Sequence, residues 1–312
     1  MLESVALAEA CGAARVFVKA ESLQKAGSFK IRGATWRLAN LSAGEKSRGV
    51  IAYSSGNFAQ GLAAAGKAAG VAVTIVMPID APAMKRRATE GFGARVVLSD
   101  HGDRPREEAA SALARDMAAA EGLVLLHPFD DPLIVAGQAG VALEALEQLA
   151  EIDAGLAAGV DLVACPVGGG GLIGGVSLAI RAARPDAQVF AVEPVGYNGM
   201  GASLARGSAL RVAPGVHTIC DALQATQPGA APFAAAAAAK VAGVVVSDAS
   251  VRAALRFSFE RLKLVLEPSG AVAIAALLAR LLPAKGRDVL VIASGGNIAL
   301  ADFLALAGPV QD

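Results

Sequence analysis

A lysine close to the amino terminus has the setting of a nucleophile. Lys30 follows Ser28, a residue type that caps helices, so the sequence predicts a helix with Lys30 in its first turn. The positive end of a helix opposes the charge of a lysine and lowers the pKa of its amine, as partial burial also does. An amine with a lowered pKa forms Schiff bases with carbonyl compounds. The alternative is a solvated surface lysine, the common setting of this residue type.

Four consecutive glycines form a second candidate site, in this case for an anion. Residues 168–171 follow an apolar run and precede a helical one, so their N–H groups and the helix start favour a phosphate. The stretch 169–174 also satisfies the dinucleotide pattern GxGxxG, with Glu193 at the end of the next predicted strand as the ribose ligand. The loop therefore predicts a phosphate-bearing cofactor and leaves open whether it is a nucleotide.

Three loops of small residues occupy equivalent places, each between an apolar run and a helical run. They are residues 54–57 (Ser-Ser-Gly-Asn), 168–171 and 294–297 (Ser-Gly-Gly-Asn). Ligands of open α/β sheets bind beyond the carboxyl ends of the strands. The three loops therefore predict one shared pocket.

The elements that position these loops are short β-branched runs that alternate with alanine-rich helical stretches. Several of the runs are apolar throughout, which indicates burial on both faces and parallel sheets covered by helices. The predicted strands are 16–19, 50–53, 73–77, 95–98, 123–126, 162–166, 188–192, 244–247 and 289–293. The clearest predicted helices are 58–69, 106–120, 134–149, 173–183 and 250–264.

Composition narrows the class of protein. The 312 residues are long enough for two domains, and 54% hydrophobic against 18% charged residues excludes general disorder. The charge is balanced at 28 basic and 28 acidic residues, which argues against nucleic acid or an anionic membrane as partner and leaves a small molecule.

Cysteines, histidines and the amino terminus indicate a cytoplasmic protein. Three scattered cysteines are too few for a disulfide framework, and three histidines share no metal-binding spacing. The amino terminus lacks the basic region of a signal peptide. The uncharged run 162–180 contains Pro166 and four glycines, so we expect a strand, a loop and a helix start rather than a membrane span.

Five motifs occur together and in register along nearly the whole chain, from about Leu2 to Leu304. They are Gly-Ser-Phe-Lys ending at Lys30, Ser-Ser-Gly-Asn at 54–57 followed by Gln60-Gly61, Val-Gly-Gly-Gly-Gly-Leu at 167–172, Leu-Glu-Pro at 266–268 and Ser-Gly-Gly-Asn at 294–297. This set resembles the pyridoxal-phosphate enzymes of fold type II, specifically the serine/threonine dehydratase and serine racemase group.

The resemblance implies a fold as well as a chemistry. We expect an α/β protein with two open, mostly parallel sheets covered by helices, similar to the β subunit of tryptophan synthase. The smaller domain, residues 48–121, is expected as an insertion in the larger domain, residues 1–47 and 122–312, with pyridoxal 5'-phosphate in the cleft between them. A homodimer is the default oligomer.

The family's functional residues map onto this sequence motif by motif. In this family the lysine of Gly-Ser-Phe-Lys forms the internal aldimine and removes the substrate α-proton, which gives Lys30 both roles. The loop asparagine bonds the ring hydroxyl and the last motif's serine bonds the pyridine nitrogen. The implied cofactor ligands are Phe29, Lys30, Asn57, Gly168, Gly169, Gly170, Gly171, Leu172 and Ser294. The implied substrate ligands are Ser54, Ser55, Gly56, Asn57 and Gln60.

The implied activity is that of an ammonia-lyase that dehydrates L-threonine or L-serine to a 2-oxo acid and ammonia. A hydroxyl beside the pyridine nitrogen leaves the ring a moderated electron sink, which favours loss of a β-leaving group. No side chain is obviously placed to protonate the leaving hydroxyl, so the cofactor phosphate is the expected donor. In racemases of this family, the serine that corresponds to Ser55 faces the lysine across the substrate. A serine or hydroxyaspartate racemase is therefore the alternative activity. A further alternative is that Ser55 only binds the substrate carboxylate. The sequence does not rank serine, threonine and hydroxyaspartate.

The sequence departs from the family pattern in three places. Phe58 stands where members often have histidine. The cation site of the family uses a glutamate that precedes a proline and an aspartate six residues later. Glu193 is present here, but Gly199 stands in the place of the aspartate. The loss of one carboxylate weakens a Mg²⁺ or Ca²⁺ site. We also expect the chain to lack the family's first helix and a carboxyl-terminal regulatory domain.

Two other functions remain as alternatives. One is a nicotinamide-dependent oxidoreductase that uses the GxGxxG match and Glu193. The other is a non-catalytic relative. Neither gives a role to Lys30, to the Ser-Ser-Gly-Asn loop or to Ser294.

Overall fold

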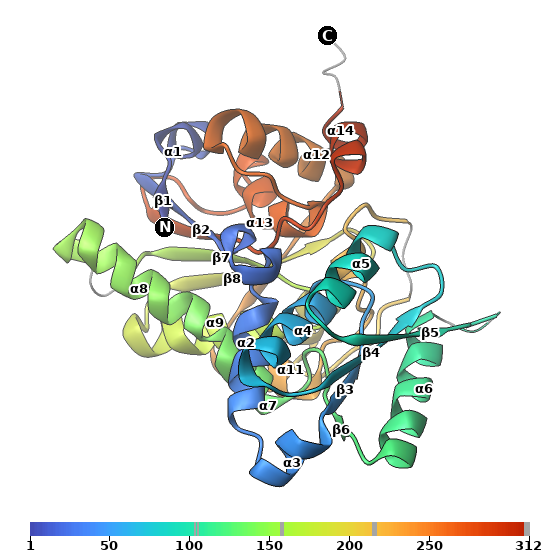
Figure 1. Cartoon of the computed structure of the whole chain (residues 1–312). Coiled ribbons are helices and arrows are strands. Elements are labelled where there is room, and N and C mark those ends of the chain that lie inside the picture. Colours follow the sequence, from blue (N-terminus) through green and yellow to red (C-terminus); the bar gives the residue numbers. More distant parts are fainter. Residues whose placement is uncertain (103, 105, 157–158, 214–216, 309–312) are drawn as a thin grey trace.

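The computed structural model describes residues 1–102, 104, 106–156, 159–213 and 217–308. It contains two sheets whose faces are covered by helices (Figure 1), which confirms the predicted α/β class. All nine predicted strands are present within a few residues of their expected bounds.

The larger sheet has six strands and is parallel except at one edge. The exception is β1, a two-residue strand that the sequence analysis missed and that pairs antiparallel with β2. Side by side, the strands are β1 (Leu2–Glu3), β2 (Arg15–Ala20), β10 (Asp288–Ala293), β7 (Leu162–Pro166), β8 (Gln188–Pro194) and β9 (Ala242–Val246). All five residues of β7 are buried, as expected for a strand covered on both faces.

Helices cover both faces of this sheet (Figure 1), and a hydrophobic core lies under each layer of helices. One face is covered by α1 (Val5–Cys11), α12 (Asp248–Phe257), α13 (Pro268–Leu278) and α14 (Leu300–Ala307). The other is covered by α8 (Gly140–Ile152), α9 (Gly171–Ala183), α10 (Gly199–Arg206) and α11 (Ala230–Ala238). Helix α13 is apolar all round and buried along its length, which is typical of a central helix.

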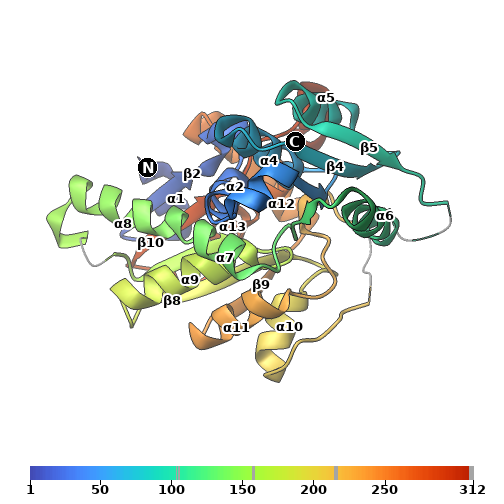
Figure 2. The ribbon, with the colours of Figure 1, turned by 60° about the horizontal axis from the view of Figure 1, so that its bottom comes forward.

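The smaller sheet has four parallel strands. Side by side, they are β5 (Arg95–Ser99), β4 (Val73–Pro78), β3 (Val50–Tyr53) and β6 (Val124–Leu125). Helices α4 (Asn57–Ala69) and α5 (Ala83–Gly91) lie on one side, and α6 (Arg106–Glu121) packs on the other (Figure 2). Helix α3 (Ala43–Arg48) precedes β3.

The core of the smaller sheet draws on more of the chain than the predicted insertion. Strand β6 lies beyond residue 121 and pairs with β3. Leu38 of helix α2 (Lys30–Ala39) and Ile134 of α7 (Pro132–Gln138) are fully buried in the same core. The domain limits stay a prediction, but the packing of this sheet extends across both of them.

Two predicted helices are interrupted. The stretch 134–149 is two helices, α7 and α8, that meet at Ala139. The stretch 250–264 is α12 followed by a π-helical turn (Ser258–Leu262), after which Lys263 adopts a left-handed φ of 58°. The alanine-rich run near 234–239 lies at the carboxyl end of helix α11.

One helical run, Pro132–Ile152, is long and apolar enough to cross a membrane by length and composition alone. The core helices of soluble proteins pass the same test. Its two halves pack against α2 and α9, and Glu144 within it forms ion pairs with Lys19 and Arg32. The run 162–180 is strand β7, the glycine loop and most of α9, as predicted.

Candidate active site

The three loops expected to share a pocket line one cavity. Lys30, Asn57, Gly168–Gly171 and Ser294 face it together. The loops follow β3 of the smaller sheet and β7 and β10 of the larger sheet, so both sheets contribute to the cavity.

Lys30 is the first residue of α2, but Ser28 does not cap the helix as predicted. The residue at the cap position is Phe29, which makes no side-chain capping bond. Ser28 is extended, at φ −163°, because its backbone forms an isolated bridge with Gly295. The Phe29 amide donates to the Ser294 carbonyl at 3.1 Å. These contacts fix the start of α2 to the loop after β10, and so place Lys30 beside Ser294.

The amine of Lys30 lies between two aromatic rings. Its Nζ is 5.1 Å from the ring centre of Phe29 and 5.9 Å from that of Phe58. Burial lowers the pKa of Lys30 to about 8, although the charges of Glu267 and Glu107 oppose the shift. A pKa of about 8 leaves about a tenth of the amine neutral at pH 7, and the neutral amine is the form that attacks a carbonyl.

The glycine loop presents backbone N–H groups to the cavity. Among the described residues, no backbone carbonyl accepts from the amides of Gly168, Gly169 and Gly170, and α9 begins immediately afterwards. Gly170 has a left-handed φ of 98°, and a Cβ on Gly169 would lie 2.4 Å from the ring of Phe129. Free amides at the start of a helix make an anion site that side chains would obstruct. Leu172, on the first turn of α9, lines the same cavity.

Asn57 connects the other two loops. At the first position of α4, its Nδ2 donates to the buried carboxylate of Glu267 and its Oδ1 accepts from Asn297 Nδ2 at 2.8 Å. Burial raises the pKa of Glu267 to about 7, and its Oε2 has no hydrogen-bond partner in the described structure. The sequence analysis noted the Leu-Glu-Pro motif but gave Glu267 no role.

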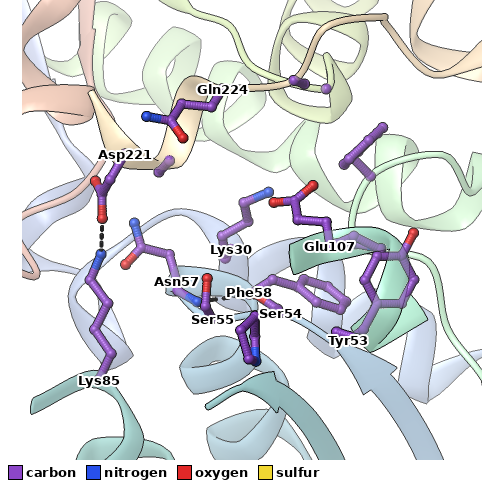
Figure 3. Close-up of a pocket in the computed structure, with 18 residues that line it drawn as sticks. Lys30, Tyr53, Ser54, Ser55, Asn57, Phe58, Lys85, Glu107, Asp221 and Gln224 are labelled. Carbon is purple, nitrogen blue, oxygen red and sulfur yellow. Dashed lines mark hydrogen bonds and ion pairs between the residues drawn. The ribbon is translucent and has the colours of Figure 1, made fainter. Parts of the chain in front are cut away.

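A second, more open part of the pocket adjoins the Ser-Ser-Gly-Asn loop (Figure 3). Ser54, Ser55, Gly56 and Asn57 all line it together with Lys30. Their role as substrate ligands stays a prediction. Gln60 does not line either part of the cavity within the described residues. It is buried in α4, and its Nε2 has no partner there.

An ion pair crosses this part of the pocket and was not predicted. Lys85 of α5 donates to Asp221 at 2.5 Å (Figure 3), and Asp221 lies in a 3₁₀ turn, Asp221–Leu223. The Nζ of Lys85 is also 4.0 Å from Glu267 Oε2. The two partners are 136 residues apart in sequence. Lys85 therefore connects the smaller sheet's helix to the larger sheet's loops.

Tyr53, at the end of β3, adds an aromatic hydroxyl to the pocket. Its Oη lies 3.0 Å from Nε2 of His127. His127 Nδ1 accepts from the Asp130 amide at 2.8 Å and from the Phe129 amide at 3.3 Å. Burial lowers the pKa of His127, which favours the neutral ring. The sequence analysis missed this pair because neither residue lies in a glycine or serine motif.

Glu193 is held by backbone. It is buried at the end of β8, and its two oxygens accept from the Met200 and Gly201 amides of α10 at 2.8 Å each. Burial raises its pKa to about 7. In the described part of the chain it does not line the glycine-loop cavity, so the ribose contact of the dinucleotide alternative is not formed there. No group of three or more His, Cys, Asp or Glu gathers there to hold a metal, and the cation site at Glu193 stays a prediction.

Comparisons with known proteins agree with this arrangement. Residues 1–295 match the model of a family described as pyridoxal-phosphate dependent enzyme. An L-threonine ammonia-lyase of Thermotoga maritima is 41% identical over 295 residues, which cover 95% of this chain and 70% of the relative. An L-threo-3-hydroxyaspartate ammonia-lyase of Saccharomyces cerevisiae is 36% identical over 96% of this chain and 88% of the relative. The solved structure of maize serine racemase superposes with a TM-score of 0.88 at 33% identity, over 97% of this chain and 89% of that one.

Proposed function

The chain belongs to the family of pyridoxal-phosphate dependent enzymes, and we propose that it is an ammonia-lyase that converts L-threonine or L-serine to a 2-oxo acid and ammonia. One observation carries the proposal. A lysine with a pKa of about 8 shares a cavity with a cradle of free amides and with the Ser-Ser-Gly-Asn loop. The relatives named as ammonia-lyases support the reaction class.

The groups that line the cavity fit pyridoxal phosphate. The free amides of Gly168–Gly170 suit its phosphate, and the Lys30 amine suits its aldehyde. Ser294 is buried, and its Oγ makes no hydrogen bond within the described residues, so it is available to the ring nitrogen. Asn57 Nδ2 has a second hydrogen beyond the one given to Glu267, which suits the ring hydroxyl.

The bound cofactor would supply an electron sink that stabilises negative charge at the substrate α-carbon. Lys30 Nζ then accepts the α-proton, since its lowered pKa keeps part of the amine neutral. The Ser294 hydroxyl is a weak proton source, so it binds the ring nitrogen without adding a full charge there. The Ser54–Asn57 loop at the start of α4 binds the substrate carboxylate, which favours the positive end of a helix.

Racemisation of serine is a second candidate activity. Ser55 lines the same pocket as Lys30, and the solved maize neighbour is a serine racemase. A second proton-transfer group on the other face of the α-carbon would permit inversion. D-serine should then accumulate slowly from L-serine, and less of it in Ser55→Ala. Absence of D-serine after long incubation of an enzyme that still releases ammonia would exclude this activity.

We propose that the enzyme acts as a homodimer in the cytoplasm. Closed two-fold dimers are the commonest soluble oligomers. The three cysteines are free and buried, as in proteins of reducing compartments. Mass photometry of the purified protein should give twice the chain mass of 31.1 kDa.

The visible absorption spectrum of the purified protein, before and after addition of L-threonine or L-serine, tests the proposed function. We expect a band of bound cofactor that changes with the amino acid, with release of ammonia and a 2-oxo acid. A protein that stays colourless after incubation with pyridoxal phosphate would contradict the proposal. A coloured protein that releases no ammonia from either amino acid would contradict the ammonia-lyase assignment alone.

A further inference from the structure

Phe58 is an aromatic residue of the substrate part of the pocket, and the proposed function gives it no role. It is the second residue of α4, it is 2% exposed, and it lines this part of the pocket together with Lys30 (Figure 3). The Nζ of Lys30 lies over its ring, 5.9 Å from the ring centre. The face of an aromatic ring carries partial negative charge, so at this distance it attracts an ammonium group.

The two aromatic rings near Lys30 lie in different parts of the cavity. In the described structure Phe29 lines the part with the glycine loop, where the cofactor binds in the proposed function, and Phe58 lines the part with the Ser-Ser-Gly-Asn loop. The Lys30 amine that accepts the α-proton is free of the cofactor. Phe58 is therefore the ring that stays available to this amine on the substrate side.

The Lys30 amine has no hydrogen bond and no ion pair within the described residues. The carboxylates of Glu267, before α13, and Glu107, in α6, act on it through their charge alone. Each carboxylate also has another cation nearby, which is Lys85 for Glu267 and Arg106 for Glu107. The pKa of Lys30 is lowered to about 8 because burial outweighs both charges. The two acids therefore do not fully stabilise the charged amine.

His127, which follows β6, is a further titratable group that faces Lys30. Burial lowers the pKa of His127, and the charge of Lys30 acts in the same direction. The neutral imidazole has no net charge, so it does not balance an ammonium group at Lys30.

A ring face suits the proton transfer because it distinguishes the two states of the amine. It attracts the ammonium form, and it has no donor that could occupy the lone pair of the neutral form. In the transfer, the bond between the substrate α-carbon and its hydrogen breaks, the electron pair stays on the substrate, and the proton forms the third N–H bond of Nζ. An interaction that strengthens as the proton moves lowers the barrier to the transfer.

We propose that Phe58 is a positioning residue for this step, and that its ring face binds the Lys30 ammonium group that forms when the amine accepts the α-proton. The inference rests on the proposed function, to which it adds a group that stabilises the protonated lysine. Apolar residues line the same part of the pocket, namely Pro78, Ala110 and Pro128. Surroundings of this kind strengthen the attraction between a cation and a ring, because they limit the water around both.

Fluorinated phenylalanines in place of Phe58 test the proposal, because fluorine withdraws electrons from the ring face and hardly changes the shape of the side chain. The variants are Phe58→monofluorophenylalanine and Phe58→trifluorophenylalanine. The same replacements at Phe92 are the control, since Phe92 packs in the core of the smaller sheet and does not line the described cavity.

Two measurements are made on each variant. The first is the pKa of Lys30 in the apoprotein, from competitive acetylation at a series of pH values followed by mass spectrometry. The second is the rate at which α-deuterated L-threonine loses its deuterium in a single turnover of the holoenzyme. A role of Phe58 confined to packing predicts no dependence on fluorine in either measurement, because the shape of the ring is retained.

We expect Phe58→trifluorophenylalanine to lower the pKa of Lys30 by ~0.4–1.5 pH units, because the charged form loses its partner, and the monofluorinated ring to lower it less. The rate of deuterium loss should fall ~2–5-fold in the same order. Fluorination of Phe92 should leave both quantities unchanged.

A Lys30 pKa that is the same with all three rings in place of Phe58 would overturn the proposal. A fall of the pKa without any change in the rate of deuterium loss would overturn it as well. A protein that removes no deuterium from threonine, yet shows the fall in the Lys30 pKa, would contradict the proposed function and leave the contact between ring and ammonium group standing.

Discussion

Two walls of the pocket differ in the groups that face the cavity, which are mostly backbone groups on one wall and side chains on the other. The cofactor wall, Gly168–Gly171 with Ser294, follows strands of the larger sheet and consists mostly of backbone groups. The substrate wall, Tyr53, Lys85 and Glu107, comes from elements of the smaller sheet and consists of side chains. Backbone positions are fixed by the fold, whereas side chains change by single substitutions. In the proposed function, cofactor binding therefore depends on the fold, and substrate choice depends on a few side chains.

The largest effect is expected at the residue that serves both walls. Lys30→Ala removes the amine that attaches the cofactor and accepts the α-proton, so kcat should fall by about 10²–10⁴-fold and the visible band should be lost. Reduction with borohydride followed by mass spectrometry checks the covalent attachment. Lys25→Ala, an exposed lysine of the same segment, is the control and should retain both. Attachment that persists in Lys30→Ala would place the reactive amine elsewhere.

The cofactor wall should not tolerate a side chain. In Gly169→Ala the new methyl would lie 2.4 Å from the Phe129 ring, so the loop must shift to relieve the contact. Loss of one hydrogen bond from the shifted amides to the charged phosphate costs ~1.5–3 kcal/mol, or ~10–150-fold in affinity. Titration of the apoprotein with pyridoxal phosphate measures the loss. Gly91→Ala has no atom within 4 Å of its new methyl and should bind the cofactor normally. Unchanged affinity in Gly169→Ala would mean that the loop is not the phosphate cradle.

The pH dependence of cofactor capture tests the chemistry of Lys30 directly. Its pKa of about 8 lies below the usual lysine value of 10.5, so the neutral amine is lost as the pH falls through 8. The rate of capture by the apoprotein should therefore fall ~10-fold for each pH unit below about 8 and level off above it. Stopped-flow absorbance gives the rate. A plateau that begins only near pH 10.5 would show an ordinary solvated amine.

The smallest effect is expected for the ion pair of the substrate wall. Lys85→Met breaks the contact with Asp221, whose side chain is 53% exposed, so water compensates much of the loss. KM for threonine should rise ~2–5-fold while cofactor affinity changes less than ~2-fold. Lys67→Met, at an exposed position of α4, is the control. Equal losses of cofactor affinity and substrate affinity in Lys85→Met would contradict separate roles for the two walls.

The sequence was sufficient for the cofactor wall because its information is local. The glycine loop, Lys30 and Ser294 each lie in a short motif next to a strand, and strands such as β7 are apolar throughout. Reasoning from local sequence did not predict β1, because this strand has only two residues and pairs only at the edge of the sheet. It also joined α7 and α8, because no proline marks the break at Ala139.

The substrate wall could not be predicted in the same way, because its contacts join distant segments. Lys85 and Asp221 are ordinary charged residues in a helix and a turn, and nothing near either indicates the other. Glu107 has the sequence context of a solvated helix start, and Glu108 beside it has the same one. The prediction that Ser28 caps a helix was wrong for a related reason. Pairing with Gly295, near the other end of the chain, decides the backbone conformation of Ser28.

The contact between Tyr53 and His127 has a direction. Because Nδ1 of the neutral His127 ring accepts from backbone amides, its one hydrogen lies on Nε2 and is donated to the Tyr53 oxygen. The hydroxyl hydrogen of Tyr53 therefore points away from the imidazole. The hydrogens of the two backbone amides, of Nε2 and of the phenol all point in the same direction along this chain of hydrogen bonds. The backbone amides of Phe129 and Asp130 therefore set, through His127, the direction of the Tyr53 O–H dipole.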